Sequence, residues 1–152
     1  MKILELLTPN KIIGNLGERA AARLLRKKGY RILKKNYTAL GAEVDIIARK
    51  GDVTAYVEVK TRNVKHLGYK EARPGSSVTP DKQRKIIKAA RFYHSRFSSE
   101  TRIRFDVIEV YTEDGVLKPR IKEIKHLEGA FDKDSAYDSK YYYQRKKEGS
   151  VL

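Results

Sequence analysis

The sequence predicts an α/β fold in which helices pack on a mixed central β-sheet. Two segments have the periodicity of amphipathic helices. Between these segments, two apolar β-branched runs joined by a glycine-containing tip predict a β-hairpin. A helix also separates the third predicted strand from the fourth, which suits a parallel crossover. The chain has 152 residues, of which 40% are hydrophobic. We therefore expect one domain with a single core over residues 1–131.

The first half of the chain is predicted to form a helix followed by three strands. Over residues 12–28, Ile13, Leu16, Ala20 and Leu24 recur at helical spacing, and Gly29 is well placed to end the helix. Residues 30–37 alternate as a first strand, and hairpin strands follow at 42–50 and 53–62. These three strands suit an antiparallel meander.

The second half is predicted to form a long loop, a second helix and one or two strands. The loop spans residues 63–78, and the helix follows Thr79 with Pro80 in its first turn. It should end near Phe97 and direct Phe97 and Ile86 toward the core. Residues 102–111 read as a fourth strand and 120–126 as a candidate fifth.

The hairpin carries carboxylates whose spacing predicts chemistry. If Gly51 and Asp52 are the two loop residues, then Asp45 lies opposite Glu58 on one face of the strand pair. Opposed Cβ atoms lie roughly 4.5–5.5 Å apart. Two carboxylates at that distance repel each other unless a proton or a cation joins them, and a hard divalent metal does so well.

A second interpretation stays open, because charged residues alternating with valines are also typical of the solvated face of a hairpin. Two details favour a site. The intervening residues, such as Ile46 and Val57, are strongly apolar, which indicates a central strand pair. Moreover, two acids face each other where simple sheet design would place opposite charges.

The order of Asp45 and Glu58-Val59-Lys60 resembles the PD-(D/E)xK signature of restriction-endonuclease-like nucleases. A wider ordered set resembles the YraN-like family of uncharacterised bacterial proteins, which is similar to archaeal Holliday-junction resolvases. This resemblance covers about residues 12–131, with one departure: Ala42 separates Gly41 from Glu43, where the family commonly has glycine directly before Glu-x-Asp. The matching segments are Gly17-Glu18-Arg19-Ala20-Ala21, Gly29-Tyr30-Arg31-Ile32-Leu33, Asn36-Tyr37, Glu43-Val44-Asp45-Ile46-Ile47-Ala48, Val57-Glu58-Val59-Lys60-Thr61-Arg62 and Arg104-Phe105-Asp106-Val107.

The resemblance implies a restriction-endonuclease-like core of order α-β-β-β-α-β and a metal-dependent endonuclease acting on DNA, branched DNA included. It implies catalytic roles for Asp45, Glu58, Lys60 and Glu18. Asp45, Glu58 and the Val59 carbonyl are the expected ligands of Mg²⁺ or Mn²⁺. The alternative is a nucleic-acid-binding protein of the same fold without turnover.

Two acidic residues have a competing surface interpretation. From the sequence alone, Glu18 could be a surface glutamate paired with Arg19 or a nearby lysine. Glu43 lies opposite Lys60 in the expected register, so it either adds a ligand or forms a salt bridge at the rim of the site.

Charge composition favours nucleic acid as the partner. Lys plus Arg number 34 and Asp plus Glu number 19, which gives a formal net charge of +15. A thermophile's charged surface is the alternative, but it predicts balanced ion pairs rather than a one-sided surplus. The start of the second helix is rich in cations and suits phosphate, although a charge run is usually only a solvated face. The expected contacts are Arg62, Arg73, Lys82, Gln83 and Lys85.

Other features bear on location and partners. There is no cysteine, and the three histidines, expected at the surface, form no local metal motif. With no signal peptide or apolar run of about 20 residues, we expect a cytoplasmic protein without a membrane partner. A twofold homodimer would help to cleave two strands. The basic, tyrosine-rich tail, 132–152, is expected to be flexible.

Overall fold

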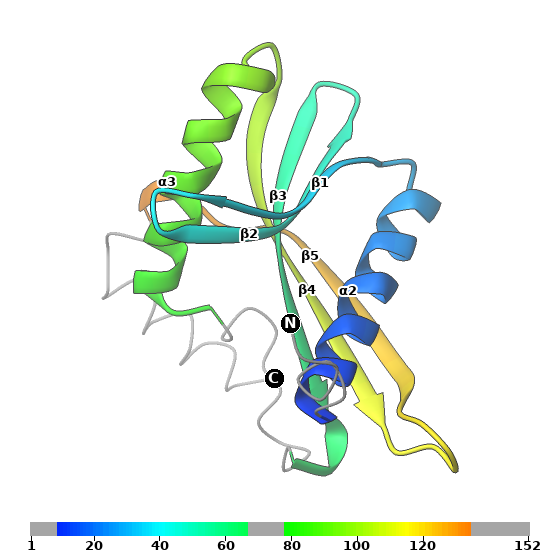
Figure 1. Ribbon diagram of the computed structural model, residues 1–152. Coiled ribbons are helices and arrows are strands. Elements are labelled where there is room, and N and C mark those ends of the chain that lie inside the picture. The colour runs from blue at the N-terminus through cyan, green and yellow to red at the C-terminus, as the bar shows by residue number, and fades with distance from the viewer. Residues whose placement is uncertain (1–8, 67–77, 135–152) are drawn as a thin grey trace, which may run out of the picture.

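Two helices cover opposite faces of a five-stranded sheet in the computed structural model, which describes residues 9–66 and 78–134 (Figure 1). Helix α2 (Pro9–Lys27) lies on one face and α3 (Pro80–Phe97) on the other. The predicted order of elements is confirmed, and the candidate fifth strand is present. The strands are β1 (Arg31–Ala39), β2 (Ala42–Lys50), β3 (Val53–Asn63), β4 (Arg102–Glu113) and β5 (Arg120–Phe131), and the short 3₁₀ helix η1 (Val64–His66) follows β3.

The sheet is mixed, with strand order β1-β2-β3-β4-β5. The first three strands form the expected antiparallel meander, and β4 pairs with β3 in parallel after the crossover through α3. Strand β5 returns antiparallel to β4. This is the architecture expected of a restriction-endonuclease-like core.

Each helix buries a separate set of apolar side chains against the sheet. Under α3 the buried set includes Tyr56, Phe105 and Val107, and under α2 it includes Leu25 and Ile108. The predicted inward placement of Phe97 is wrong, because its side chain is 64% exposed. Helical periodicity gives Phe97 the same side as the buried Tyr93, and the two ring centroids lie 4.9 Å apart, but Phe97 is the last residue of α3 and its ring stays mostly exposed at the helix end.

The predicted hairpin register is confirmed up to the point where the sheet divides. Lys50 faces Val53 across the tip, and pairing continues to Ile46 opposite Val57. There β2 leaves β3, whereas β3 stays paired with β4 as far as Asn63. Beyond this point the β1–β2 hairpin turns toward α3 (Figure 1). The sheet therefore forks at Asp45 and Glu58, the next residues along the two strands.

Three expectations fall on residues outside the described part of the chain. These are the conformation of most of the loop at 63–78, the flexibility of the tail beyond residue 134, and the position of Arg73. Within residues 9–66 and 78–134, no helix has the length and apolar character needed to cross a membrane.

Candidate active site at the fork of the sheet

The two hairpin carboxylates come together at the fork between β2 and β3. Asp45 Oδ2 accepts a hydrogen bond of 2.8 Å from the backbone N–H of Val59, beyond the last β2–β3 pair. This bond turns the Asp45 carboxylate toward β3, where it is close enough to Glu58 for the two charges to repel each other. At the fork, therefore, the backbone N–H of Val59 binds the carboxylate of Asp45, and Asp45 and Glu58 are brought close together.

The carboxylate of Glu58 is deeply buried but only half satisfied. Glu58 is 3% exposed, and its Oε1 lies 3.4 Å from Lys60 Nζ and 3.0 Å from Lys82 Nζ. Among the described residues, its buried Oε2 has no hydrogen-bond donor. Because an unsatisfied buried acceptor is costly, Glu58 Oε2 needs a partner, which a proton on Asp45, a water or a cation would supply.

Asp45 is poised between its two protonation states. Burial is the largest cause that raises its pKa, and repulsion from Glu58 raises it further, to about 7. The hydrogen bond from the Val59 N–H works in the opposite direction but does not cancel these effects. A carboxyl group with such a shift, beside a second acid, is typical of a functional site.

A close helix–strand contact brings Glu18 to the same site. Gly17 of α2 packs so tightly against β3 that a Cβ placed on it would lie 1.8 Å from Thr61 Oγ1. The next residue, Glu18, is half-buried, and burial, then Glu43, then Glu58 raise its pKa, partly offset by Lys35. The predicted convergence of Glu18 on the two hairpin acids therefore has a physical basis in the missing side chain of Gly17.

The donor set fits a magnesium or manganese ion that substrate and water complete. Asp45 and Glu58 offer carboxylate oxygens, the ligands that Mg²⁺ prefers, and Glu58 Oε2 has no donor. In residues 9–66 and 78–134, no three His, Cys, Asp or Glu side chains form a group able to hold a metal. Magnesium commonly uses only one or two carboxylates together with phosphate oxygens and waters. The Val59 carbonyl stays a predicted ligand. Glu43 is exposed, and no ion pair joins it to Lys60.

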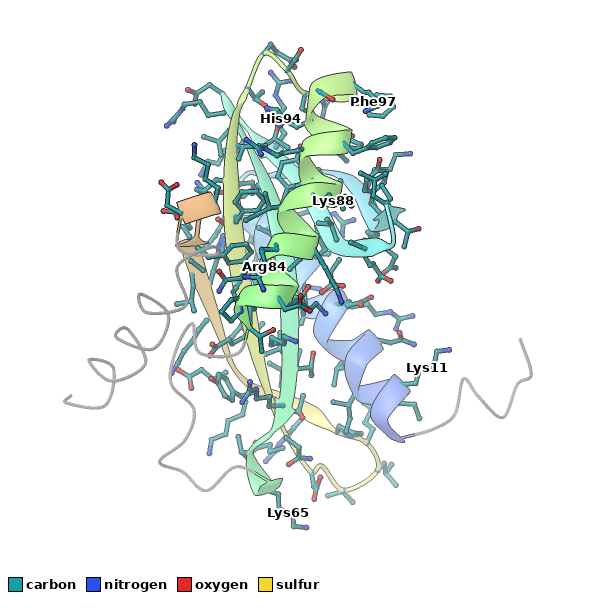
Figure 2. The ribbon with its side chains drawn as sticks, turned by 90° about the vertical axis from the view of Figure 1, so that its left-hand side faces the viewer. Lys11, Lys65, Arg84, Lys88, His94 and Phe97 are labelled. Carbon is teal, nitrogen blue, oxygen red and sulfur yellow. The ribbon has the colours of Figure 1, made fainter. Side chains whose placement is uncertain are left out.

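The residues predicted to bind nucleic acid are only partly brought together. Lys82 and Lys85 lie in the first turns of α3, where Lys85 forms an exposed ion pair of 3.3 Å with Asp81. Arg62 is half-buried on β3, two residues beyond Lys60. Gln83 does not join them, because its buried side chain donates to the Val78 carbonyl at 2.9 Å. Figure 2 shows α3 from its outer side, with Lys88 one turn beyond Arg84.

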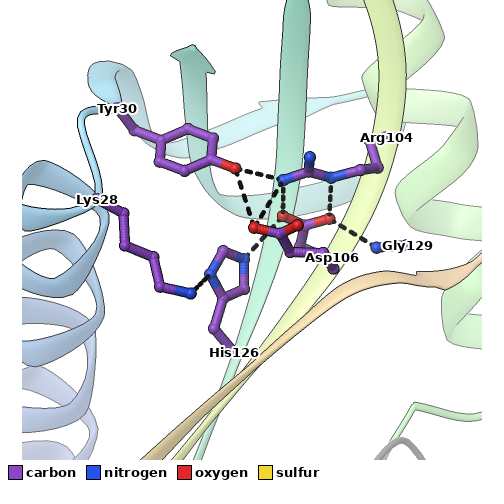
Figure 3. Close-up of polar contacts among 7 residues, drawn as sticks. Lys28, Tyr30, Arg104, Asp106, His126 and Gly129 are labelled. Carbon is purple, nitrogen blue, oxygen red and sulfur yellow. Dashed lines mark hydrogen bonds and ion pairs between the residues drawn. The ribbon is translucent and has the colours of Figure 1, made fainter.

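A polar cluster that the sequence did not predict lies on the α2 side of the sheet (Figure 3). The buried Asp106 accepts two hydrogen bonds from Arg104, at 2.8 and 2.7 Å, and others from His126 and the Gly129 N–H. Burial alone would raise the pKa of Asp106, but these donors outweigh it and lower the pKa. The expected surface position is wrong for His126, whose side chain is 1% exposed.

The same cluster ties the end of α2 to the far strands of the sheet. Tyr30 accepts from Arg104 at 2.6 Å, and Lys28 Nζ lies 2.9 Å from His126 Nδ1. Both oxygens of Asp106 are used by protein donors, which indicates a structural role. The signal available in the sequence was a lone aspartate between Phe105 and Val107 in an apolar strand.

Comparison with known proteins places this sequence in a family. Residues 17–110, more than half of the chain, match Uncharacterised protein family UPF0102. A UPF0102 protein of Geobacter sulfurreducens is 41% identical over 124 residues, covering 81% of this chain and 91% of that relative. One of Clostridium perfringens is 45% identical over 102 residues, covering 66% and 80%, respectively. One of Chlorobium phaeobacteroides is 42% identical over 122 residues, covering 78% and 93%. The matched family region begins at Gly17 and contains every carboxylate of the fork.

Proposed function

This chain belongs to Uncharacterised protein family UPF0102, and we propose that it is a metal-dependent nuclease that hydrolyses phosphodiester bonds in DNA. The observation that carries the proposal is the pair of half-buried Asp45 and buried Glu58, in which Glu58 Oε2 has no donor among the described residues although Lys60 is close to Oε1. Two acids held this close cost stability once both are ionised, and a bound divalent cation would relieve that cost.

Each residue of the fork has a role in such a reaction. Asp45 and Glu58 would hold Mg²⁺ or Mn²⁺, which when bound polarises a phosphate and lowers the pKa of a coordinated water. Lys60, with its ammonium at the edge of the site, would orient the attacking water or neutralise charge that develops on the phosphate. Glu18 would hold a further water from the α2 side.

Binding would rest on charge more than on base contacts. The net charge of +15 favours a polyanion, and Arg62, Lys82 and Lys85 lie on the elements that form or flank the fork. The sequence shows no base-reading motif, so we propose recognition of backbone and shape, with DNA, including branched DNA, as substrate. A homodimer and a cytoplasmic location stay predictions.

The decisive experiment is a Mg²⁺ and Mn²⁺ titration of cleavage on branched, duplex and single-stranded DNA. Asp45→Asn and Lys60→Ala should each abolish turnover and largely spare DNA affinity, because neither removes much of the positive charge. Asp52→Asn is the matched control: it changes an exposed aspartate at the tip of the same hairpin, so cleavage should persist.

Two results would contradict the proposal. Equal cleavage by the wild type, Asp45→Asn and Lys60→Ala would place the activity elsewhere or in a contaminant. Tight binding with no cleavage of any DNA form at any metal concentration would favour the alternative, a nucleic-acid-binding protein without turnover.

A further inference from the structure

Glu58 forms an ion pair with a second lysine, Lys82, which belongs to a different element of the fold. Lys60 is on the same strand, two residues along, whereas Lys82 reaches in from the first turn of α3. Lys82 Nζ is nevertheless the closer of the two to Glu58 Oε1, at 3.0 Å against 3.4 Å. The backbone of Lys82 is held in place, since its N–H donates to the N-cap side chain of Thr79. Only the flexible side chain of Lys82 is free to move.

The ammonium of Lys82 lies in the negative field of the acids at the fork. Burial lowers the pKa of Lys82, but Glu58, Asp45 and Glu43 raise it more, so the group stays protonated. These include both proposed metal ligands. A lysine and a divalent cation would therefore compete for the same negative field and the same carboxylate.

The two partners differ in their access to water. The Lys82 side chain is 47% exposed, whereas Glu58 is 3% exposed. The lysine can withdraw its ammonium into solvent by rotating its own bonds, whereas Glu58 is fixed within β3. Lys60 has less freedom, with a side chain 28% exposed and an attachment on the same strand.

We propose that Lys82 is a displaceable counterion of Glu58. In the metal-free protein the Lys82 ammonium pairs with the Glu58 carboxylate, and it leaves that carboxylate when a divalent cation binds there. The proposal rests on the nuclease function above. Once displaced, the Lys82 ammonium is free at the start of α3 to contact a DNA phosphate. Metal binding and phosphate binding then favour each other, because each takes one partner of the Lys82–Glu58 ion pair.

The first test is Mn²⁺ affinity, measured by electron paramagnetic resonance on the full chain without DNA. Lys82→Gln should tighten Mn²⁺ binding by about tenfold, because it removes a competing unit charge at contact distance. Lys88→Gln removes an equal charge from the exposed side of the same helix and should change the affinity less than about twofold, because screening weakens distant surface charges. Lys82→Arg keeps the charge and should not tighten binding.

The second test uses the wild type alone and so does not depend on whether a variant folds. An amine-reactive reagent, read out by mass spectrometry, should modify Lys82 several-fold faster in saturating Mn²⁺ than without it. Lys88 is the internal control, and its rate should not change.

The outcomes separate this inference from the proposed function. Mn²⁺ binding that depends on Asp45, with equal affinity in wild type and Lys82→Gln, would overturn the inference and leave the metal site standing. Unchanged labelling of Lys82 under saturating Mn²⁺ would overturn it in the same way. If the wild type, Lys82→Gln and Asp45→Asn all fail to bind Mn²⁺, both the inference and the proposed function are overturned.

Discussion

Two aspartates on neighbouring parts of the same sheet carry opposite pKa shifts, although burial raises the pKa of both. Asp106 receives two hydrogen bonds from a guanidinium and others from His126 and Gly129, which lower its pKa below the ordinary 3.8. Asp45 receives one backbone N–H and faces another acid, so its pKa rises to about 7. Because burial raises the pKa of both carboxyl groups, the hydrogen-bond donors around Asp106 account for the opposite direction of its shift.

The shift of Asp45 predicts that the metal-free protein loses stability as pH rises. Its folded-state pKa lies above the unfolded value near 3.8, so its contribution is fully present below pH 4 and is lost as pH rises through about 7. Asp45→Asn removes the ionisable group, so the variant does not undergo this loss of stability as pH rises. At pH 8 in chelator, the variant should exceed the wild type in free energy of unfolding by on the order of 2 kcal/mol.

Asp106→Asn is the matched control with the opposite sign. The lowered pKa of Asp106 supports the fold above pH 4, so this variant should be less stable than the wild type at pH 7, and the deficit should shrink as pH falls below 3.8. Urea unfolding at pH 4 and pH 8 measures the Asp45→Asn effect, and unfolding at pH 7 and at a pH below 3.8 measures the Asp106→Asn effect. An Asp45→Asn variant with the same stability difference at both pH values would contradict the assignment.

At the scale of elements, the contact between α2 and β3 decides where Glu18 lies. A methyl group on Gly17 would collide with Thr61 Oγ1, so Gly17→Ala must push the helix away from the strand that carries Glu58 and Lys60. We expect a loss of about 2 kcal/mol in unfolding free energy, from overpacking, and a drop in DNA cleavage.

Gly14→Ala is the control, because the space around Gly14 is open for 4 Å and the residue lies on the same helix. It should stabilise the protein by about 0.5–1 kcal/mol, the ordinary difference between the two residues in a helix, and leave cleavage intact. Equal stability of the two variants would show that α2 does not sit this close to β3.

The elements also show how far sequence patterns reach. The two-residue tip fixed the register of the hairpin, so the meeting of Asp45 and Glu58 was predictable from residue counting. The fork was not predictable, because it arises where the β1–β2 hairpin packs Tyr37 of β1 and Val44 of β2 against the core under α3, and that packing depends on a helix distant in the sequence. The buried position of His126 likewise depends on Asp106, which is 20 residues away in the chain.

At the scale of the whole molecule, the acidic groups at the fork and the surplus of basic groups predict two different ligands. The acids at the fork are drawn together against their mutual repulsion, while the chain as a whole carries a surplus of 15 positive charges. A metal ion would satisfy the first arrangement and a polyanion the second. Substitutions at the fork should therefore change cleavage, and substitutions of outer cations should change affinity.

The surplus predicts that DNA affinity falls steeply with salt. Each phosphate neutralised on duplex DNA contributes roughly −0.9 to the slope of log K against log salt, so about five contacts would cost about a thousandfold over a fivefold rise in salt. Fluorescence anisotropy across a salt series, in chelator to prevent cleavage, measures this slope.

Lys85→Glu should make the slope shallower by about 1, because it removes one phosphate contact near the fork. Lys122→Glu makes the same charge change on the exposed part of β5 and should affect the slope less. Both effects should be the same for unrelated DNA sequences, since backbone contacts carry no sequence information. Affinity that does not respond to salt, or a Lys85→Glu effect limited to one DNA sequence, would contradict recognition through the backbone.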